Sequence, residues 1–172
     1  MGTRTLTSVE EYLQSSFEVD CDYVDGELQE RNLGEKDHGK LQFQLMMWFH
    51  ARRKTLGTYA FQEQRLRVSP TRYRVPDVCV YIGREPEKQV FDVPPFLSVE
   101  VLSPEDRFSR LRQRLDDYSR FGVPHIWVVD PFERRAYTYF SGDLQEVKDG
   151  ILRTQDPVIE VPLKDIFAAM DE

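Results

Sequence analysis

The chain has 172 residues, of which 40% are hydrophobic and 31% are charged, and this composition excludes a disordered or fibrous protein. No run of about 18 apolar residues is present, so no membrane-spanning segment is expected. The formal net charge of -7 argues against a protein that coats nucleic acid through charge alone. The length fits one domain, and the N-terminal sequence MGTRTLTSVEEYL lacks the apolar core of a signal peptide, so we expect a cytoplasmic protein.

The N-terminal part of the chain predicts a short helix and a hairpin. Thr7 and Glu10 fit a capping box at the start of a helix of about two turns. Residues 21–31 form two short alternating runs joined at Asp25-Gly26, a dipeptide that strongly favours a two-residue hairpin turn. These elements are expected to precede the main fold.

The middle of the chain predicts a long helix followed by a strand pair. The apolar stripe over residues 37–54 indicates a helix with Asp37 as its N-cap. Residues 58–68 and 73–82 each alternate over much of their length, and a Ser-Pro-Thr turn separates them. The second of these strands becomes continuously apolar after Asp77, which is typical of an inner strand.

The following segments complete the expected core. Residues 96–102, FLSVEVL, predict another inner strand, and residues 106–121 predict a helix that stops at Gly122. The apolar run 126–129 predicts a further buried strand. The order from position 37 is therefore helix, three strands, helix, strand, which indicates an α/β (α+β) fold with helices packed on a mixed sheet.

Two carboxylates stand out in this pattern. Glu100 lies within an apolar strand, and a buried ionised carboxylate is costly unless it is paired, hydrogen-bonded or bound to a metal. Asp77 stands at the mouth of the neighbouring apolar strand, so the two groups are expected to converge. Two carboxylates and water suit Mg²⁺ or Mn²⁺ and can activate water against a phosphodiester. The alternatives are a salt bridge from Glu100 to Arg114 and a simple turn-capping role for Asp77.

Long segments of the sequence resemble the Uma2 (DUF820) family. They are RVPDVCVY, PPFLSVEVLSPEDR and QRLDDYSRFGVPHIWVVDP, and DYVDGEL matches the opening hairpin of that family. The resemblance covers most of the chain and implies the αβββαβ core of the restriction-endonuclease-like PD-(D/E)XK nucleases. It also implies that Asp77 and Glu100 hold the metal, that the backbone carbonyl of Val101 is a third ligand, that DNA is the partner and that the protein forms homodimers.

The resemblance also assigns supporting residues. Leu102 occupies the position of the lysine in the plain nuclease motif, and Arg114, four residues before Tyr118, stands where the resemblance places the family lysine, on the following helix. Arginine keeps the positive charge but is a poor replacement for a lysine that positions or deprotonates water. Glu27 and His38 match positions near the family active site and are expected to support metal-bound water. An exposed hairpin carboxylate and a helix-capping histidine are the alternatives.

Six arginines are candidates for nucleic-acid binding. Those on the two strands alternate around a turn and predict one basic face toward a phosphate backbone, whereas the others lie at the start of the later helix. The alternative is that they are solvated and protect a sheet edge or a helix face. The residues are Arg65, Arg67, Arg72, Arg74, Arg107 and Arg110.

We therefore expect one Uma2-like nuclease-fold domain over residues 1–172. It would comprise a helix and hairpin extension (1–34), the core (37–130) and C-terminal strands with a short helix (131–172). The expected function is divalent-metal-dependent endonucleolytic hydrolysis of DNA phosphodiester bonds. The alternative is a catalytically impaired nuclease fold that binds nucleic acid or a protein, which the missing lysine and the acidic net charge favour.

Overall fold

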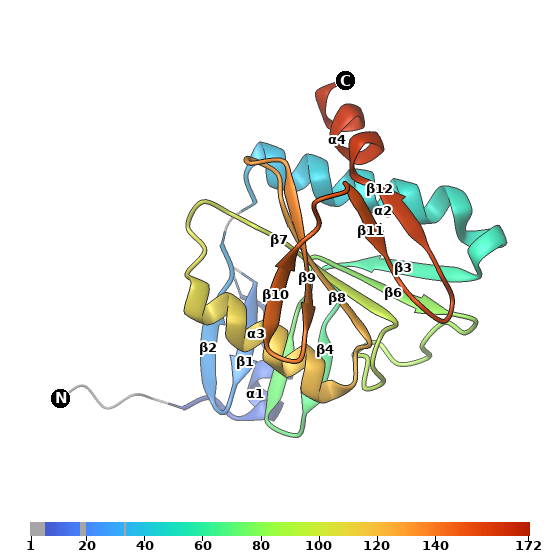
Figure 1. Cartoon of the computed structure of the whole chain (residues 1–172). Helices are drawn as coiled ribbons and strands as arrows, with labels where there is room; N and C mark the ends of the chain where they lie inside the picture. The colour runs from blue at the N-terminus through green and yellow to red at the C-terminus, as the bar shows by residue number, and fades with distance from the viewer. Residues whose placement is uncertain (1–5, 18–19, 33) are drawn as a thin grey trace.

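The computed structural model describes residues 6–17, 20–32 and 34–172, and Figure 1 shows helices packed on a central sheet with a second sheet beside it. The helices in these ranges are α1 (Val9–Gln14), α2 (Lys36–Leu56), α3 (Phe108–Phe121) and α4 (Leu163–Asp171). The strands are β1 (Cys21–Val24), β2 (Glu27–Glu30), β3 (Thr58–Gln62), β4 (Leu66–Ser69), β5 (Arg72–Arg74), β6 (Val78–Ile82), β7 (Leu97–Val101), β8 (His125–Asp130), β9 (Arg135–Phe140), β10 (Asp143–Glu146), β11 (Ile151–Arg153) and β12 (Glu160–Pro162).

The central sheet has the strand order β10-β9-β8-β7-β6-β3. Strands β7 and β8 run parallel and the other neighbours run antiparallel, so the sheet is mixed, as predicted. Along the chain, α2, β3, β6, β7, α3 and β8 form the αβββαβ core expected from the sequence, with β4 and β5 inserted between β3 and β6. The predicted fold class is confirmed.

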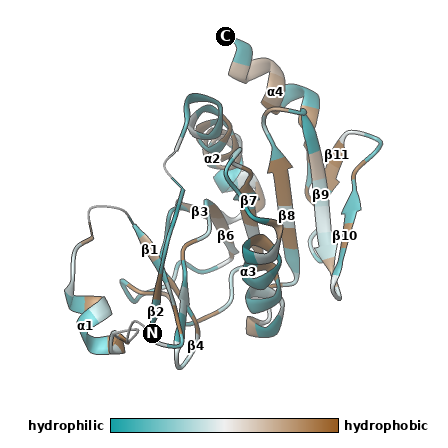
Figure 2. Ribbon diagram, turned by 90° about the vertical axis from the view of Figure 1, so that its left-hand side faces the viewer, coloured by the Kyte–Doolittle hydropathy of each residue, from teal (hydrophilic) through white to brown (hydrophobic). Residues whose placement is uncertain are grey.

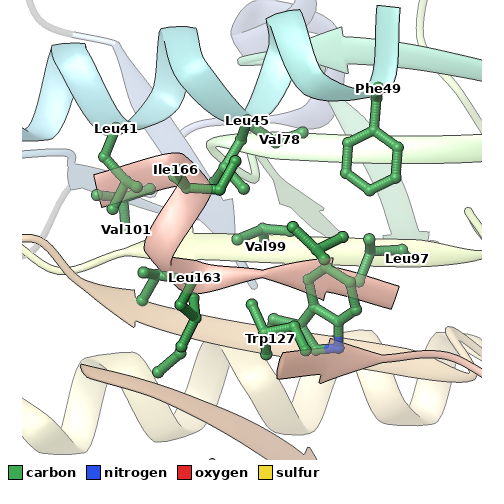
Figure 3. Packing of buried hydrophobic residues seen from close by; sticks show 14 of the residues in the cluster. Leu41, Leu45, Phe49, Val78, Leu97, Val99, Val101, Trp127, Leu163 and Ile166 are labelled. Carbon is green, nitrogen blue, oxygen red and sulfur yellow. The ribbon is translucent and has the colours of Figure 1, made fainter. Parts of the chain in front are cut away.

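Helices α2 and α4 cover one face of the sheet. Val99 of β7 and Trp127 of β8 pack beneath Leu41 and Leu45 of α2, and Ile166 of α4 joins the same cluster (Figure 3). All five side chains are at most 3% exposed. The strands β11 and β12 and the helix α4 therefore share the hydrophobic core of α2 and the central sheet.

Helix α3 covers the opposite face. Because side chains alternate along a strand, the neighbours of Val99 on β7, Ser98 and Glu100, point toward α3 instead of α2. Leu115 and Tyr118 of α3 lie in a second apolar cluster with side chains of β6 and β8. Figure 2 shows the largely hydrophobic strand β8 beside α3. Glu100 is thus a carboxylate on the apolar interface between the sheet and α3.

The second sheet has the order β2-β1-β5-β4 and corrects one sequence-based expectation. Residues 58–68 and 73–82 were expected as two continuous strands, but each is divided between the two sheets. The first run is interrupted at Glu63, whose φ is 49°. The second is interrupted at Pro76, which has no N–H for a sheet hydrogen bond. As a result, Asp77 lies where the chain passes from the second sheet into the first.

The ends of the predicted elements are partly confirmed. Asp25 and Gly26 both have positive φ, 50° and 93°, as their two-residue hairpin turn requires. Gly122 ends α3 in the left-handed conformation, as predicted. The predicted N-caps are wrong by one or two residues, because α1 is capped by the Ser8 hydroxyl and α2 begins after Glu35.

Candidate active site

Asp77 is a buried carboxylate just ahead of β6, and it is 3% exposed. Its Oδ2 accepts a hydrogen bond of 2.7 Å from the backbone N–H of Val101, which ties it to the end of β7. Its Oδ1 accepts a hydrogen bond of 2.7 Å from Nη2 of Arg31 and lies 3.4 Å from Nε2 of His38. One oxygen is therefore held by fixed backbone and the other by two side chains.

Glu100 lies on the neighbouring strand and is also 3% exposed. The Tyr118 hydroxyl donates a hydrogen bond of 2.6 Å to its Oε1, and Nε of Arg114 lies 3.1 Å from its Oε2. Residues four apart in a helix share one face, so α3 presents both the hydroxyl and the guanidinium to the same carboxylate. Arg114 also reaches Oδ1 of Asp106, at 3.4 Å.

The two carboxylates differ in acidity. Burial is the largest influence on Glu100 and raises its pKa to about 7, and the nearby charge of Asp77 adds to the effect while Arg114 opposes it. Burial would also raise the pKa of Asp77, but the hydrogen bond of His38, the charge of Arg31 and the N–H of Val101 together lower it. The pair thus contains one firmly ionised carboxylate and one whose ionisation is near balance at neutral pH.

His38 lies in the first turn of α2 and is 9% exposed. Burial acts to lower its pKa, whereas the hydrogen bond and the charge of Asp77 raise it above the ordinary value. The prediction that placed His38 near the carboxylates is therefore matched by its position. Asp77 therefore favours the cationic form of His38, whose Nε2 faces Oδ1 of that carboxylate.

A polar recess connects these groups. Both carboxylates, His38 and Arg114 line it, together with side chains that the sequence had not singled out. Beside it lies a cavity of about 330 Å³ that shares Arg114 with the recess and is also lined by Arg107 and Arg110. The residues around the recess are Arg31, Asn32, His38, Asp77, Glu100, Val101, Ser103, Asp106 and Arg114.

Three members of this site were missed by sequence reasoning. Arg31 follows the hairpin and carried no signal, because nothing in its local pattern shows that the end of β2 lies against Asp77. Asp106 accepts hydrogen bonds from the N–H of Ser103 at 2.7 Å and from Asn32 at 3.1 Å, and was passed over as a helix-start residue. Tyr118 was used only to count back to Arg114, although a tyrosine one helical turn from that arginine was itself a usable signal.

Glu27 lies at the first position of β2, four residues before Arg31, and does not line the recess. It pairs in register with Val24 of β1. A strand advances about 3.3 Å per residue, so Glu27 is well removed from Asp77 along the strand. The predicted role of Glu27 beside metal-bound water stays a prediction, since Glu27 is not among the residues that line the recess.

Two of the predicted nucleic-acid-binding arginines are held in ion pairs within the protein, Arg74 fully buried and Arg72 half-buried. Arg74 is 0% exposed and donates hydrogen bonds to Asp22 at 2.9 Å and to Asp117 at 2.8 Å. Arg72 binds Asp117 at 2.8 Å and Asp25 at 2.6 Å. The expected single basic face on these strands is therefore wrong, because tertiary contacts bring acidic partners from α3 and from the N-terminal hairpin to both side chains.

The other four arginines are at least partly accessible. Arg65 is half-buried, with its guanidinium 4.6 Å from the ring centroid of Tyr12, and Arg67 is exposed. Arg107 and Arg110 are exposed at the start of α3 and line the cavity next to Arg114. Their position, close to the carboxylate pair, is compatible with the predicted contact to a phosphate backbone.

The family resemblance implies a divalent metal ion, which would need oxygen ligands from the residues of the recess. Within residues 6–17, 20–32 and 34–172, no three His, Cys, Asp or Glu side chains are grouped closely enough to hold a metal ion by themselves. The oxygens that suit Mg²⁺ are the carboxylates of Asp77 and Glu100 and the carbonyl of Val101, with water completing the shell. The raised pKa of Glu100 fits such a cation, because a buried carboxyl group of this kind gains stability from added positive charge.

The αβββαβ core and the pair of buried carboxylates on adjoining strands define a protein with a restriction-endonuclease-like nuclease fold. The chain belongs to the Uma2 family, whose model, described as "putative restriction endonuclease", matches residues 9–166. A crystal structure of a "putative nuclease belonging to DUF820" from Anabaena variabilis ATCC 29413 has the same fold, with a TM-score of 0.78 and 20% sequence identity, over 94% of this chain and 97% of that one.

No curated protein matches the sequence. In the described part of the chain, no helix has the length and apolar character needed to cross a membrane.

Proposed function

We propose that the protein is a divalent-metal-dependent endonuclease that hydrolyses phosphodiester bonds of DNA. The observation that carries the proposal is the meeting of Asp77 and Glu100 at one polar recess, in a chain of the Uma2 family. Buried carboxylates from neighbouring strands are expensive to maintain, and a metal site is a function that would account for keeping them together.

Asp77, Glu100 and the carbonyl of Val101 would hold the Mg²⁺ or Mn²⁺ ion. When bound, such an ion supplies Lewis-acid polarisation of a phosphate oxygen and lowers the pKa of coordinated water. Tyr118 keeps the Glu100 carboxylate in a fixed orientation through its 2.6 Å hydrogen bond. Asp77 is kept ionised by its donors, so it is ready as an oxygen ligand at neutral pH.

Arg114 would stabilise negative charge on the phosphate, since its guanidinium lies beside Glu100 and borders the adjoining cavity. The pKa of Arg114 is raised by its carboxylate neighbours, although burial opposes them, so it stays cationic and cannot act as the base. Arg107 and Arg110 would bind neighbouring phosphates, and this contribution should weaken as salt concentration rises. His38 would orient water. From the family resemblance we also propose that the protein forms a homodimer.

A second candidate is a nuclease fold with impaired catalysis that binds nucleic acid or a protein. Each of the four oxygens of Asp77 and Glu100 already has a hydrogen-bond donor or a cationic group of the chain within 3.4 Å. Arg114 also replaces the lysine of the family pattern. Both observations favour a site in which the arginines have taken over part of the role of the metal.

The test combines thermal unfolding and plasmid nicking in millimolar Mn²⁺. The wild-type protein is expected to gain several degrees in Tm and to nick DNA, and Glu100→Gln is expected to lose both effects. Glu146→Gln, an exposed glutamate on β10, is the matched control and should behave like the wild type. Stabilisation without nicking would favour the second candidate, and the absence of any metal effect on the wild type would refute the metal site.

A further inference from the structure

We propose that Arg31 is an internal counter-cation that exchanges with the divalent metal ion at Asp77. In the metal-free protein its guanidinium neutralises Asp77, and when the ion binds, this guanidinium leaves the carboxylate and becomes a phosphate donor at the mouth of the recess. The inference rests on the proposed function, because it concerns the same metal site. It assigns a positioning role to a residue that neither the sequence pattern nor the family resemblance singled out.

The two oxygens of Asp77 have different kinds of partner, one from the backbone and one from a side chain. Oδ2 is fixed by the backbone N–H of Val101, which cannot withdraw without breaking the end of β7. Oδ1 is bound at 2.7 Å by Nη2 of Arg31, so a metal ion approaching Oδ1 meets a guanidinium already there. A divalent cation placed at Oδ1 would therefore be repelled by the guanidinium, and this repulsion is strong because the site is buried.

The second argument is that Arg31 is able to move and Asp77 is not. The Arg31 backbone is anchored by its N–H bond to the carbonyl of Asp20, at 3.0 Å, so release of the guanidinium needs only side-chain rotation. The Asp20 carboxylate lies 3.7 Å from the same guanidinium and offers it a second acceptor. The Arg31 side chain is 17% exposed, which gives its head group a path toward solvent.

The third argument comes from a comparison with Arg114, the other guanidinium at the recess. Arg114 is carried by the middle of α3 and binds two carboxylates, Glu100 and Asp106. Arg31 follows the last residue of β2, and its second carboxylate, Asp20 at 3.7 Å, does not line the recess, unlike Asp106. The exchangeable cation is therefore Arg31, whereas Arg114 remains with Glu100.

The exchange has a consequence for the substrate. The next residue, Asn32, donates a hydrogen bond to Asp106, which borders both the recess and the arginine-lined cavity. A released Arg31 guanidinium stays at this border, so metal binding would add one positive charge where a phosphate group is proposed to bind. Metal and phosphodiester should then strengthen each other's binding, as linkage requires.

The test is Mn²⁺ affinity, measured by titration calorimetry on the wild type, Arg31→Met and a control. Arg153→Met is the control, because Arg153 also pairs with two carboxylates but lies on β11, away from the recess. Arg31→Met is expected to bind Mn²⁺ about tenfold or more tightly than the wild type, since the competing charge is gone. The control should match the wild type.

A second measurement does not depend on the folding of the variant. The side-chain Nε–H NMR signal of Arg31 in the wild-type protein, identified by its loss in Arg31→Lys, should shift or broaden as Mg²⁺ is added. Two results would overturn the exchange and leave the metal site intact. One is an Arg31 signal that does not change at saturating Mg²⁺, and the other is equal Mn²⁺ affinity of the wild type and Arg31→Met. If neither protein binds Mn²⁺ at millimolar concentration, the metal site fails as well. Binding by Arg31→Met alone also overturns the exchange, because it shows that Arg31 blocks the natural site and does not yield to the metal.

Discussion

Two buried charge clusters in this molecule are built from the same residue types and have different characters. One joins Arg72 and Arg74 to aspartates of β1 and α3, and the other joins Arg31 and Arg114 to Asp77 and Glu100. The first encloses a fully buried guanidinium, whereas the second borders a polar recess. The comparison teaches that burial of ionic groups alone does not mark a candidate site. What distinguishes the second cluster is its opening and a carboxylate of raised pKa.

The largest expected effect comes from breaking the closed cluster. Arg74→Met should leave Asp22 and Asp117 buried without their main counter-ion and lower the free energy of unfolding by about 3–5 kcal/mol. Chemical denaturation at neutral pH measures the loss, with Arg153→Met as a control for removal of an exposed paired arginine. A loss no larger than that of the control would show that the cluster does not hold α3 to the second sheet.

The next effect concerns the open cluster and depends on pH. Folded Glu100 holds its proton up to about pH 7, whereas an unfolded glutamate releases it near its ordinary pKa of 4.5. The folded state therefore binds more protons in this window, and wild-type stability should fall as pH rises through it, by up to about 3 kcal/mol.

Glu100→Gln removes that dependence, so its free energy of unfolding relative to the wild type should rise between pH 5 and pH 8. These pH values span the window set by the folded and unfolded pKa of Glu100, about 7 and 4.5. Denaturation across the range, with Glu146→Gln alongside, measures the trend. A constant difference between Glu100→Gln and the wild type would mean that Glu100 is ionised at every pH tested.

The smallest stability effect is expected for Arg114→Lys, within about 1 kcal/mol, because a lysine can keep the ion pair with Glu100. This substitution restores the residue type of the family pattern, so metal-dependent plasmid nicking should increase. Lys40→Arg, on α2, is a control for the exchange of the two cations. Unchanged or lower nicking by Arg114→Lys would show that the arginine is not what limits catalysis.

Much of the architecture could be predicted because its causes are local. Alternating apolar runs, the Asp25-Gly26 turn and the stop at Gly122 depend on neighbouring residues, and the αβββαβ order followed from them. The division of the two long strands was missed, since it depends on which sheet each half can pair with. In the structure, the chain changes sheets at Glu63, which has a positive φ, and at Pro76, which has no backbone N–H to donate.

The site was predictable to the extent that its chemistry stood out from its surroundings. Glu100 interrupts an apolar strand and Asp77 precedes one, so both were found, and Arg114 was found through the family pattern. Arg31 was missed, and Arg74 was wrongly expected to face nucleic acid. An arginine looks the same in sequence whether it faces solvent or a buried carboxylate. The identity of its partner is decided by contacts between distant segments, such as Arg74 with Asp117.

The insertion of β4 and β5 between β3 and β6 bears on when the site can assemble during translation. Strand β1 pairs with β5, so the N-terminal hairpin must wait for about forty further residues before its sheet can form. The donors to Glu100 arrive later still, on α3. A ribosome-bound or truncated chain that ends before α3 thus lacks the complete recess. If the protein cuts DNA, chains that end before α3 are inert, and cleavage begins only with chains that have been synthesised past α3.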